Sequence, residues 1–185
     1  MTQIVLETPR LVLRQIREDD LEAHMALLNT PAVMDHLGGV QPRDVIAEKH
    51  ASSRASFAAE GFGFMMLEDR ETGDIVGNCG LRRVVHPYAP NPGDFEIGWL
   101  VREDSWRLGY AYEAMRAVVD WGFTSHAAPF IVALTCHANV GSWGLMEKLG
   151  MTRRPDLDFN DPTLPPEDSP TIQYAITRQQ WESER

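Results

Sequence analysis

The feature that most constrains this chain is an apolar stretch, Phe95–Val101, followed within a few residues by a glycine-bearing loop and a helix that starts near Gly109. Such an apolar run is typical of a buried strand. The first amides of a helix have no partner within the helix, and the helix dipole adds partial positive charge at that end. Gly109 and Ala111 are small, so a ligand can approach the main chain closely. The segment therefore predicts a strand, a turn and a helix that together bind an anion such as a pyrophosphate.

The spacing around this turn excludes two common phosphate loops. The residues from Ser105 to Ala114 have neither the Gly-Lys-Ser/Thr end of a P-loop nor the repeated glycines of a dinucleotide-binding fingerprint. A second motif, Asn139–Met151, follows the next apolar stretch and reads Asn-Val-Gly-Ser-Trp-Gly-Leu-Met-Glu-Lys-Leu-Gly-Met. Two motifs in this order, each preceded by a strand pattern, form a more specific signal than either one alone.

The first motif resembles the acetyl-CoA pyrophosphate loop of the GNAT N-acetyltransferase superfamily, Gln/Arg-x-x-Gly-x-Gly/Ala. It is most similar to the ribosomal-protein-alanine acetyltransferase branch, and the matching positions are Trp106, Gly109, Tyr110, Ala111, Glu113 and Ala114. The second motif is similar to that branch's Asn-x-x-Ser-x-x-x-x-Glu-Lys-Leu-Gly-Phe helix. Residues 7–14 and 173–181 also resemble the branch's opening and closing strands, so the resemblance covers nearly the whole chain. Two loop positions depart from the usual pattern, with Trp106 in place of Gln or Arg and Arg107 in place of Gly.

The resemblance implies an α/β (α+β) fold of the GNAT type. We expect one domain over residues 1–185, with a mixed central sheet of about six to seven strands flanked by helices. The alternation of apolar and polar residues predicts strands at 10–16, 64–68, 75–85, 95–101, 130–136 and 171–176, and an antiparallel meander at the N-terminal end. Helices are predicted to begin at Asp19 or Asp20, with Leu21, Met25 and Leu28 on one face, and to span 45–59, 109–125 and 142–149. The proline-rich, acidic segment 155–170 is predicted to be an ordered surface loop.

Charge and composition narrow the function classes. The chain has a net charge of -10, which argues against a nucleic-acid partner and suits a cationic acceptor such as an amine. The same charge is also ordinary for a protein that only needs to stay soluble. No apolar run is long enough for a membrane span, and the first residues lack a signal peptide's pattern, so we expect no membrane contact and a cytoplasmic location. Cys79 and Cys136 lie in strand patterns without metal-type spacing, and no His-x-x-x-His pair occurs, so the sequence predicts no disulfide and no metal site.

The resemblance also implies a set of acetyl-CoA contacts. The main chain of Trp99, Leu100 and Val101 would pair with the pantetheine arm, and the amides around Leu108, Gly109, Tyr110, Ala111 and Tyr112 would bind the pyrophosphate. Arg107 could reach a CoA phosphate or could be a solvated loop residue, and a positive φ at this position would fit an arginine poorly. Asn139 would lie beside the pantetheine, although Asn is also common at helix-entry turns without any ligand.

Two side chains are candidates for proton transfer. Glu96 interrupts an apolar strand and shares a face with Gly98 and Leu100, so burial should shift its pKa toward the working range of a general base. Glu96 could instead be solvated or ion-paired, in which case a water chain or His137 could serve. By resemblance to the branch, Ser142 would stabilise or protonate the leaving thiolate, and it could also cap its helix.

The leading hypothesis is an acetyl-CoA-dependent N-acetyltransferase in which a primary amine attacks directly within a ternary complex. The alternative is a catalytically silent acyl-CoA-binding or regulatory module. Cys136 as an acetylated nucleophile is disfavoured, because a buried thiol with no activating neighbour is inert. The acceptor, a protein N-terminus, polyamine, aminoglycoside or amino acid, is not specified, because residues 30–60, 86–93 and 155–170 would contact it. His36 lies in a turn that resembles the border of the branch's acceptor pocket, and a homodimer is possible but not predicted by any segment.

Overall fold

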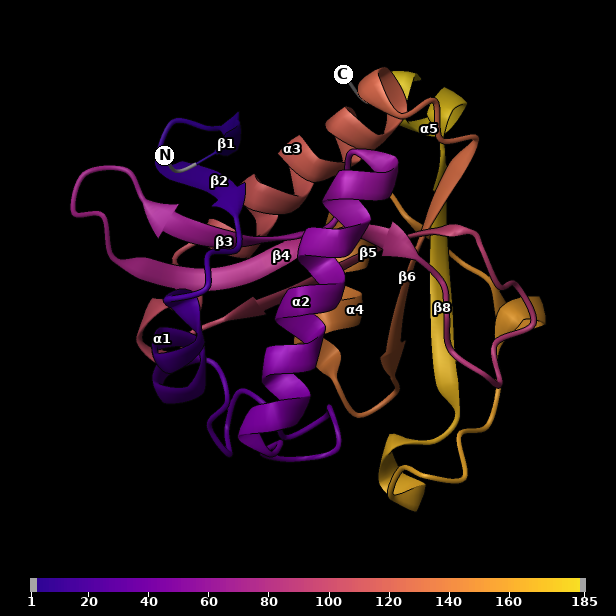
Figure 1. Ribbon diagram of the computed structural model, residues 1–185. Helices are drawn as coiled ribbons and strands as arrows, with labels where there is room; N and C mark the ends of the chain where they lie inside the picture. The colour runs from indigo at the N-terminus through magenta and orange to yellow at the C-terminus, as the bar shows by residue number, and fades with distance from the viewer. Residues whose placement is uncertain (1–2, 184–185) are drawn as a thin grey trace.

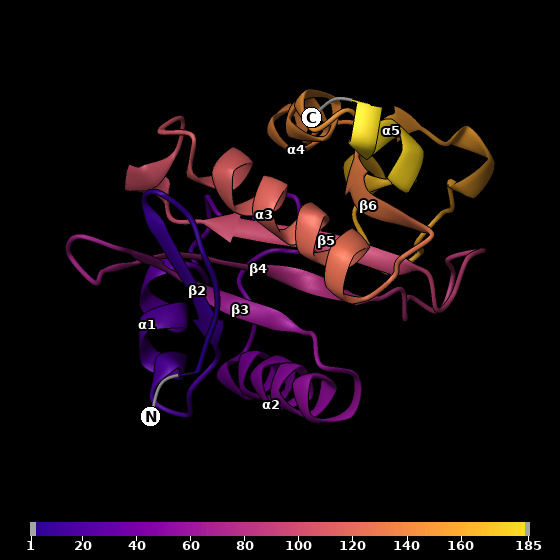
Figure 2. The same ribbon diagram turned by 90° about the horizontal axis from the view of Figure 1, so that it is seen from above.

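The computed structural model describes residues 3–183 as one mixed sheet with helices on both faces. Over these residues the sheet has eight strands in the order β1-β2-β3-β4-β5-β6-β8-β7. Figure 2 shows α3, α4 and α5 on one face of this sheet and α1 and α2 on the other. The predicted α/β architecture with an antiparallel N-terminal meander is confirmed.

Six strands match the predicted ranges to within two residues. Two more, β1 and β7, were not predicted and bring the sheet to eight strands over residues 3–183 instead of the expected six to seven. The strands are β1 (Ile4–Glu7), β2 (Leu11–Gln15), β3 (Phe64–Asp69), β4 (Ile75–Arg83), β5 (Phe95–Val101), β6 (Phe130–Cys136), β7 (Thr152–Arg153) and β8 (Thr171–Thr177). The helices are α1 (Asp20–Leu27), α2 (Arg43–Glu60), α3 (Tyr110–Ser125), α4 (Val140–Lys148) and α5 (Arg178–Ser183). The loop from 155 to 170 carries two short 3-10 turns, Pro155–Leu157 and Pro166–Asp168, and Phe159 forms an isolated bridge to Thr171.

The topology changes at β5. Strands β1 to β5 pair antiparallel in chain order, with Gly73 in the left-handed region (φ 76°) at the β3–β4 turn. The chain then crosses over through α3, so β5 and β6 are parallel neighbours. Strand β8 pairs antiparallel with β6 and separates it from the short β7. The parallel junction therefore lies in the middle of the sheet, where a helix N-terminus follows one of its two strands.

The main core lies between the sheet and α3. It joins residues of β2, β3, β4 and β5 to the apolar face of α3, including Met115, Val118 and Val119, all fully buried. A smaller cluster of Ile16, Leu28 and Met66 packs on the opposite face, below α1. Among the helices of the described residues, none is long and apolar enough to cross a membrane.

Helix α1 has Asp19 at its N-cap, as predicted, but without a side-chain cap bond, and it also buries a polar face. Asp20 and His24 are the buried residues of the helix, whereas Leu21 and Met25 are only partly buried and Leu28 lies just past its end. Asp20 receives two hydrogen bonds of 2.7 Å from the fully buried Arg14 of β2. Because a buried guanidinium requires a carboxylate beside it, α1 is oriented with Asp20 toward Arg14. Apolar periodicity alone cannot reveal such a partner.

Candidate active site

The site begins where β5 and β6 separate. Strand β5 pairs with β4 along all of its residues, but with β6 only at Glu96↔Val132 and Ile97↔Ala133. Figure 1 shows the two strands starting side by side and then running apart. The segment Trp99–Val101, predicted to pair with a ligand, borders this gap.

The main chain of β5 alternates between β4 and the gap. The Arg102 amide donates to the Val76 carbonyl at 3.0 Å, so the Val101 carbonyl of the same planar peptide unit points the opposite way, toward the gap. By the alternation of a strand, Trp99 also presents its main-chain groups to the gap, whereas those of Leu100 face β4. A Cβ on Gly77 would meet the Leu100 oxygen, which places this carbonyl against β4. Of the three predicted contacts, Trp99 and Val101 thus face the gap.

Trp106 already forms a hydrogen bond to one of the main-chain groups that face the gap. Its indole Nε1 donates a 2.6 Å hydrogen bond to the Val101 carbonyl. The side chain nevertheless remains exposed at the surface. The unusual residue at the first loop position therefore closes the open end of β5, and the main chain of Trp99 is left available deeper in the gap.

The loop after β5 ends at an uncapped helix. Gly109 is the N-terminal flanking residue of α3, with φ 84° and no side-chain cap. The first helical hydrogen bond runs from the Glu113 amide to the Gly109 carbonyl. The amides of Tyr110, Ala111 and Tyr112 consequently have no partner within the helix, and an anion in front of them would gain from the helix dipole. The predicted anion-binding residues Leu108–Tyr112 lie at this end.

Arg107 adopts the conformation that an arginine disfavours. Its φ is 62°, in the left-handed region where the family pattern has glycine. For a residue with a Cβ this conformation costs about 1–2 kcal/mol. The side chain is exposed, and Arg107 lies two positions before Gly109 in the loop that leads into α3.

A hydrogen-bonded brace, formed by Thr8 and Arg10 with Glu113, holds this loop. No sequence pattern predicted these contacts. Glu113 on α3 accepts hydrogen bonds from the Thr8 hydroxyl (2.6 Å), the Arg10 amide (2.9 Å) and Arg10 Nε (2.6 Å). Arg10 also donates to the Leu108 carbonyl at 2.9 Å. Burial favours neutral Glu113, but the bonds from Thr8 and Arg10 outweigh it and hold the pKa of Glu113 below its ordinary value. Both ends of this brace lie in segments that resemble the ribosomal-protein-alanine acetyltransferase branch. That resemblance was the signal from which the brace could have been found.

At the start of α4, Asn139 is the cap. Its Oδ1 accepts a 3.1 Å hydrogen bond from the Ser142 amide, and the helix begins at Val140 rather than at the predicted Ser142. Ser142 is therefore the third helical residue, and the alternative that its own side chain caps α4 is wrong. The structure gives the Ser142 hydroxyl no hydrogen-bond partner among residues 3–183. Asn139 keeps its amide group for another partner while its oxygen serves the helix.

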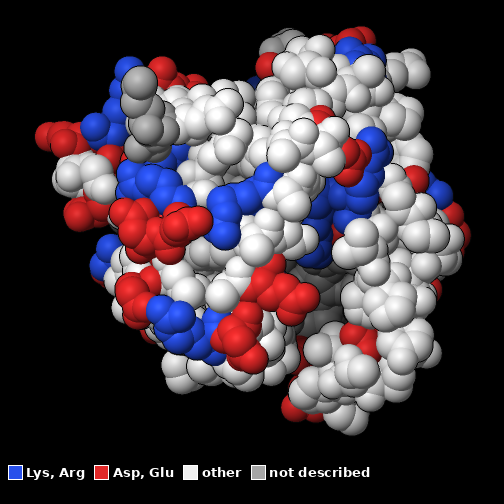
Figure 3. Space-filling model, in the orientation of Figure 1, with Lys and Arg blue, Asp and Glu red and all other residues white. Residues whose placement is uncertain are grey.

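Glu96 is buried on the face that carries α1 and α2. It is 4% exposed, and Leu100 on the same side of β5 packs in the cluster with Ile16 and Leu28. Arg82, its cross-strand neighbour on β4, forms a 2.6 Å ion pair with it and is half exposed. Figure 3 shows this face hollowed between α2 and the segments beyond β6, with basic side chains along the upper part of the hollow.

The remaining candidates lie around the end of β6. His137 is exposed on the turn after the strand. Cys136 is buried and its thiol donates to Asp168 at 3.3 Å. Burial and this hydrogen bond raise the pKa of Cys136, which is the opposite of what an acetylated nucleophile needs.

Comparisons with known proteins agree with this geometry. The family described as "Acetyltransferase (GNAT) domain" matches residues 10–152. The chain is 31% identical over 153 residues to YoaA of Bacillus subtilis (strain 168), an uncharacterized N-acetyltransferase, covering 80% of this chain and 83% of YoaA. It is 28% identical over 189 residues to the FsC-acetyl coenzyme A-N(2)-transacetylase of Aspergillus fumigatus (97% and 78% covered). The acetyltransferase structure from Agrobacterium tumefaciens str. C58 superposes with a TM-score of 0.76 at 28% identity, covering 96% of this chain and 95% of that one.

Proposed function

This chain belongs to the GNAT acetyltransferase family and is an acetyl-CoA-dependent N-acetyltransferase, and from this premise we propose that a primary amine attacks acetyl-CoA directly in a ternary complex. The observation that carries the proposal is the gap between β5 and β6, which ends at the uncapped N-terminus of α3. An extended pantetheine arm fits beside a strand with unpaired main-chain groups, and a pyrophosphate fits the free amides of a helix.

On this proposal the donor is held mostly by main chain. Trp99 pairs with the pantetheine, the amides from Leu108 to Tyr112 bind the pyrophosphate, and Arg107 adds a cation beside the phosphates. The free amide group of Asn139 is available to the pantetheine. Main-chain contacts depend on strand position and not on side-chain identity, so the departure at Arg107 leaves this mode of binding intact. The departure at Trp106 takes the Val101 carbonyl and leaves Trp99 for the pantetheine.

The proton transfers fall to Glu96 and Ser142. Glu96 accepts a proton from the acceptor ammonium, directly or through a water molecule. The neutral amine nitrogen then forms a bond to the thioester carbonyl carbon and releases a second proton to solvent, and the carbon–sulfur bond breaks to leave the neutral amide. Ser142 donates its hydroxyl proton to the departing thiolate and recovers one from solvent. A positioned general base typically contributes about 10²- to 10⁴-fold in rate.

The acceptor is the least determined part of the proposal. Resemblance of both motifs to the ribosomal-protein-alanine acetyltransferase branch supports a protein N-terminal amine. A polyamine, an aminoglycoside or an amino acid would require only changes in the loops of the acceptor side, which a shared fold does not fix.

One observation favours the silent acyl-CoA-binding alternative. Glu96 is ion-paired with Arg82 at 2.6 Å, so the guanidinium already occupies a carboxylate oxygen that would have to accept the proton of the amine. If Glu96 is the general base, the bound acceptor must displace Arg82 from Glu96 or transfer its proton to Glu96 through a water molecule.

Measuring CoA-thiol release with N-terminal peptides, polyamines, aminoglycosides and amino acids separates the two readings. We expect turnover with one group. Glu96→Gln should then lower kcat by about 10²- to 10⁴-fold, and Ser142→Ala should lower it less, both with unchanged acetyl-CoA affinity by calorimetry. His137→Gln is the matched control for the alternative base and should leave kcat unchanged. Flat rates across the panel with intact acetyl-CoA binding would favour an acceptor outside the panel or the silent module.

A further inference from the structure

Three side chains that can bind a metal meet at the end of β6. The His36 Nδ1 atom lies 3.1 Å from Asp168 Oδ1, and Cys136 Sγ lies 3.3 Å from the same oxygen. The three donor atoms all lie within 4.8 Å of one another. They come from the α1–α2 loop, the last residue of β6 and the turn Pro166–Asp168. Figure 1 shows the end of β6 and this turn at the same lower end of the molecule.

The cluster lacks a strong positive partner for its carboxylate. Asp168 is 3% exposed, and its side chain contacts a thiol, which is a weak donor, and one imidazole. Among the ion pairs of residues 3–183, no lysine or arginine pairs with Asp168. A buried carboxylate needs a cation or several hydrogen bonds to offset its loss of hydration. A further positive charge beside Asp168 would therefore stabilise its buried carboxylate.

A second carboxylate lies behind the histidine. Asp35 Oδ2 is 3.7 Å from His36 Nε2, the ring nitrogen that faces away from Asp168. A histidine that binds a metal through one nitrogen commonly directs the other toward a carboxylate, which orients the ring and makes it a better ligand. Asp35 is within ion-pair range of His36 Nε2 but beyond hydrogen-bond distance, so it would have to move closer to orient the ring.

We propose that His36, Cys136 and Asp168 bind one divalent transition-metal ion, with Zn²⁺ as the best match. Imidazole nitrogen, thiolate sulfur and carboxylate oxygen are the ligands zinc takes in proteins. Zn–N of about 2.0 Å and Zn–S of about 2.3 Å give tetrahedral edges of about 3.3–3.6 Å, close to the two measured separations. Three protein ligands leave a fourth position for water or for a donor atom of a ligand.

The binding step conserves charge and protons. The Cys136 thiol releases its proton to solvent, and the thiolate, the carboxylate and the neutral imidazole then bind the cation. Because the thiol is protonated without metal, affinity rises with pH. The ion joins two loops to β6, so it fixes the acceptor end of the molecule. This proposal does not depend on the acetyl-transfer chemistry.

Cobalt(II) titration of the chelator-treated full chain tests the site. Cobalt bound to a thiolate in tetrahedral geometry gives intense visible bands and a sulfur-to-cobalt charge-transfer band, which Zn²⁺ then abolishes. We expect both bands at one equivalent. Cys79→Ala, which removes the other buried cysteine, should keep them, and Cys136→Ser should lose the charge-transfer band. His36→Gln retains the thiol and involves a partly exposed residue, so it guards against misfolding of the Cys136 variant. It should weaken binding at least tenfold.

Asp35→Asn distinguishes a built site from a chance contact. Asp35 is exposed and should not affect folding, yet its loss should weaken cobalt binding about tenfold if it orients His36. Absence of the charge-transfer band in the wild-type chain, or its persistence in Cys136→Ser, would overturn the proposal. The cluster would then be a hydrogen-bonded loop anchor.

Discussion

Arg107 shows at the scale of one residue how a motif tolerates a departure. Its backbone takes the left-handed conformation that the family's glycine supplies at no steric cost. The fold thus enforces the loop shape on an unfavourable residue, and the strain is retained where the phosphates are proposed to bind. A positive φ at Arg107 could not be predicted from the residue type, which disfavours it, and the structure shows that the loop requires it.

Comparing two variants of Arg107 isolates this strain. Arg107→Gly and Arg107→Ala both remove the guanidinium, but only Gly relieves the left-handed backbone. We expect the glycine variant to be more stable than the alanine variant by about 1 kcal/mol in urea unfolding. Both should lose the same acetyl-CoA affinity. Equal stabilities would mean that the loop does not hold a positive φ in solution.

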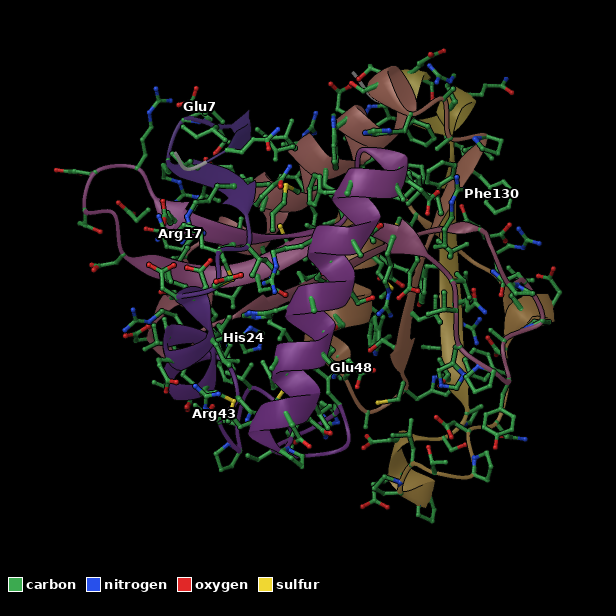
Figure 4. The ribbon with its side chains drawn as sticks, in the orientation of Figure 1. Glu7, Arg17, His24, Arg43, Glu48 and Phe130 are labelled. Atoms are coloured by element: carbon green, nitrogen blue, oxygen red, sulfur yellow. The ribbon has the colours of Figure 1, made fainter. Side chains whose placement is uncertain are left out.

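His24 is a second residue whose role depends on its surroundings. Its Nδ1 atom lies 2.9 Å from His50 Nε2, which joins α1 to α2, and Figure 4 shows His24 between these helices. Burial, together with the charges of His50 and Lys49, lowers its pKa to about 4 against an opposing effect of Asp20. Arg54 acts on the partner His50 in the same direction, and burial is the main cause there. The pair is therefore neutral at pH 7.

This pair predicts a pH-dependent stability. Because the folded pKa of His24 lies below its unfolded value of about 6.5, folding favours the neutral ring. The contribution is present in full above pH 6.5 and is lost as the pH falls toward 4, by up to about 3 kcal/mol. Urea unfolding from pH 7 to 4 should show this loss, and His24→Leu should reduce the slope. His137→Gln, at an exposed site, should keep the wild-type slope, and an unchanged slope in His24→Leu would refute the assignment.

At the scale of elements, local patterns predicted the two strands of the site at their observed bounds. Phe95–Val101 and Phe130–Cys136 are apolar runs with clear turns at their ends, so their structure is encoded locally. The two-residue β7 and the polar buried face of α1 were not predictable in this way. Strand β7 exists through its pairing with β8, and the face of α1 is set by Arg14 and His50. These features depend on partners distant in the sequence.

The brace formed by Thr8, Arg10 and Glu113 leads to a prediction at the scale of elements. Glu113→Ala removes three hydrogen bonds and leaves Arg10 without its carboxylate. Hydrogen bonds to charged groups are worth about 1.5–3 kcal/mol each when partly buried, and the exposure of Arg10 reduces this. We expect a loss of about 1–3 kcal/mol in stability and a weaker acetyl-CoA affinity, by unfolding and calorimetry. Glu182→Ala, an exposed carboxylate of α5, is the control and should change neither quantity.

At the scale of the whole molecule, the proposed donor gap is predictable from sequence and the acceptor side is not. The donor gap follows from two motifs that each lie next to a strand, so local patterns contain most of it. The acceptor side that we propose would be formed by residues 30–60, 86–93 and 155–170, which meet only in the folded chain. His36 and Asp168 are 132 positions apart, and no spacing rule joins them. Acceptor identity is therefore a property of tertiary contacts.

Residue-resolved hydrogen exchange tests how the two parts of the sheet respond to the donor. Strands β5 and β6 share two pairs of residues, so a ligand in the gap should supply the pairing that the strands themselves lack. On adding acetyl-CoA, we expect the amides of Trp99 and of Tyr110, Ala111 and Tyr112 to become protected. The Leu100 amide faces β4 and should be protected already, which makes it an internal control on the neighbouring residue. Protection that rises equally at Leu100 and Trp99 would show that the ligand tightens the whole sheet instead of pairing with β5, and the proposed main-chain binding mode would then fail.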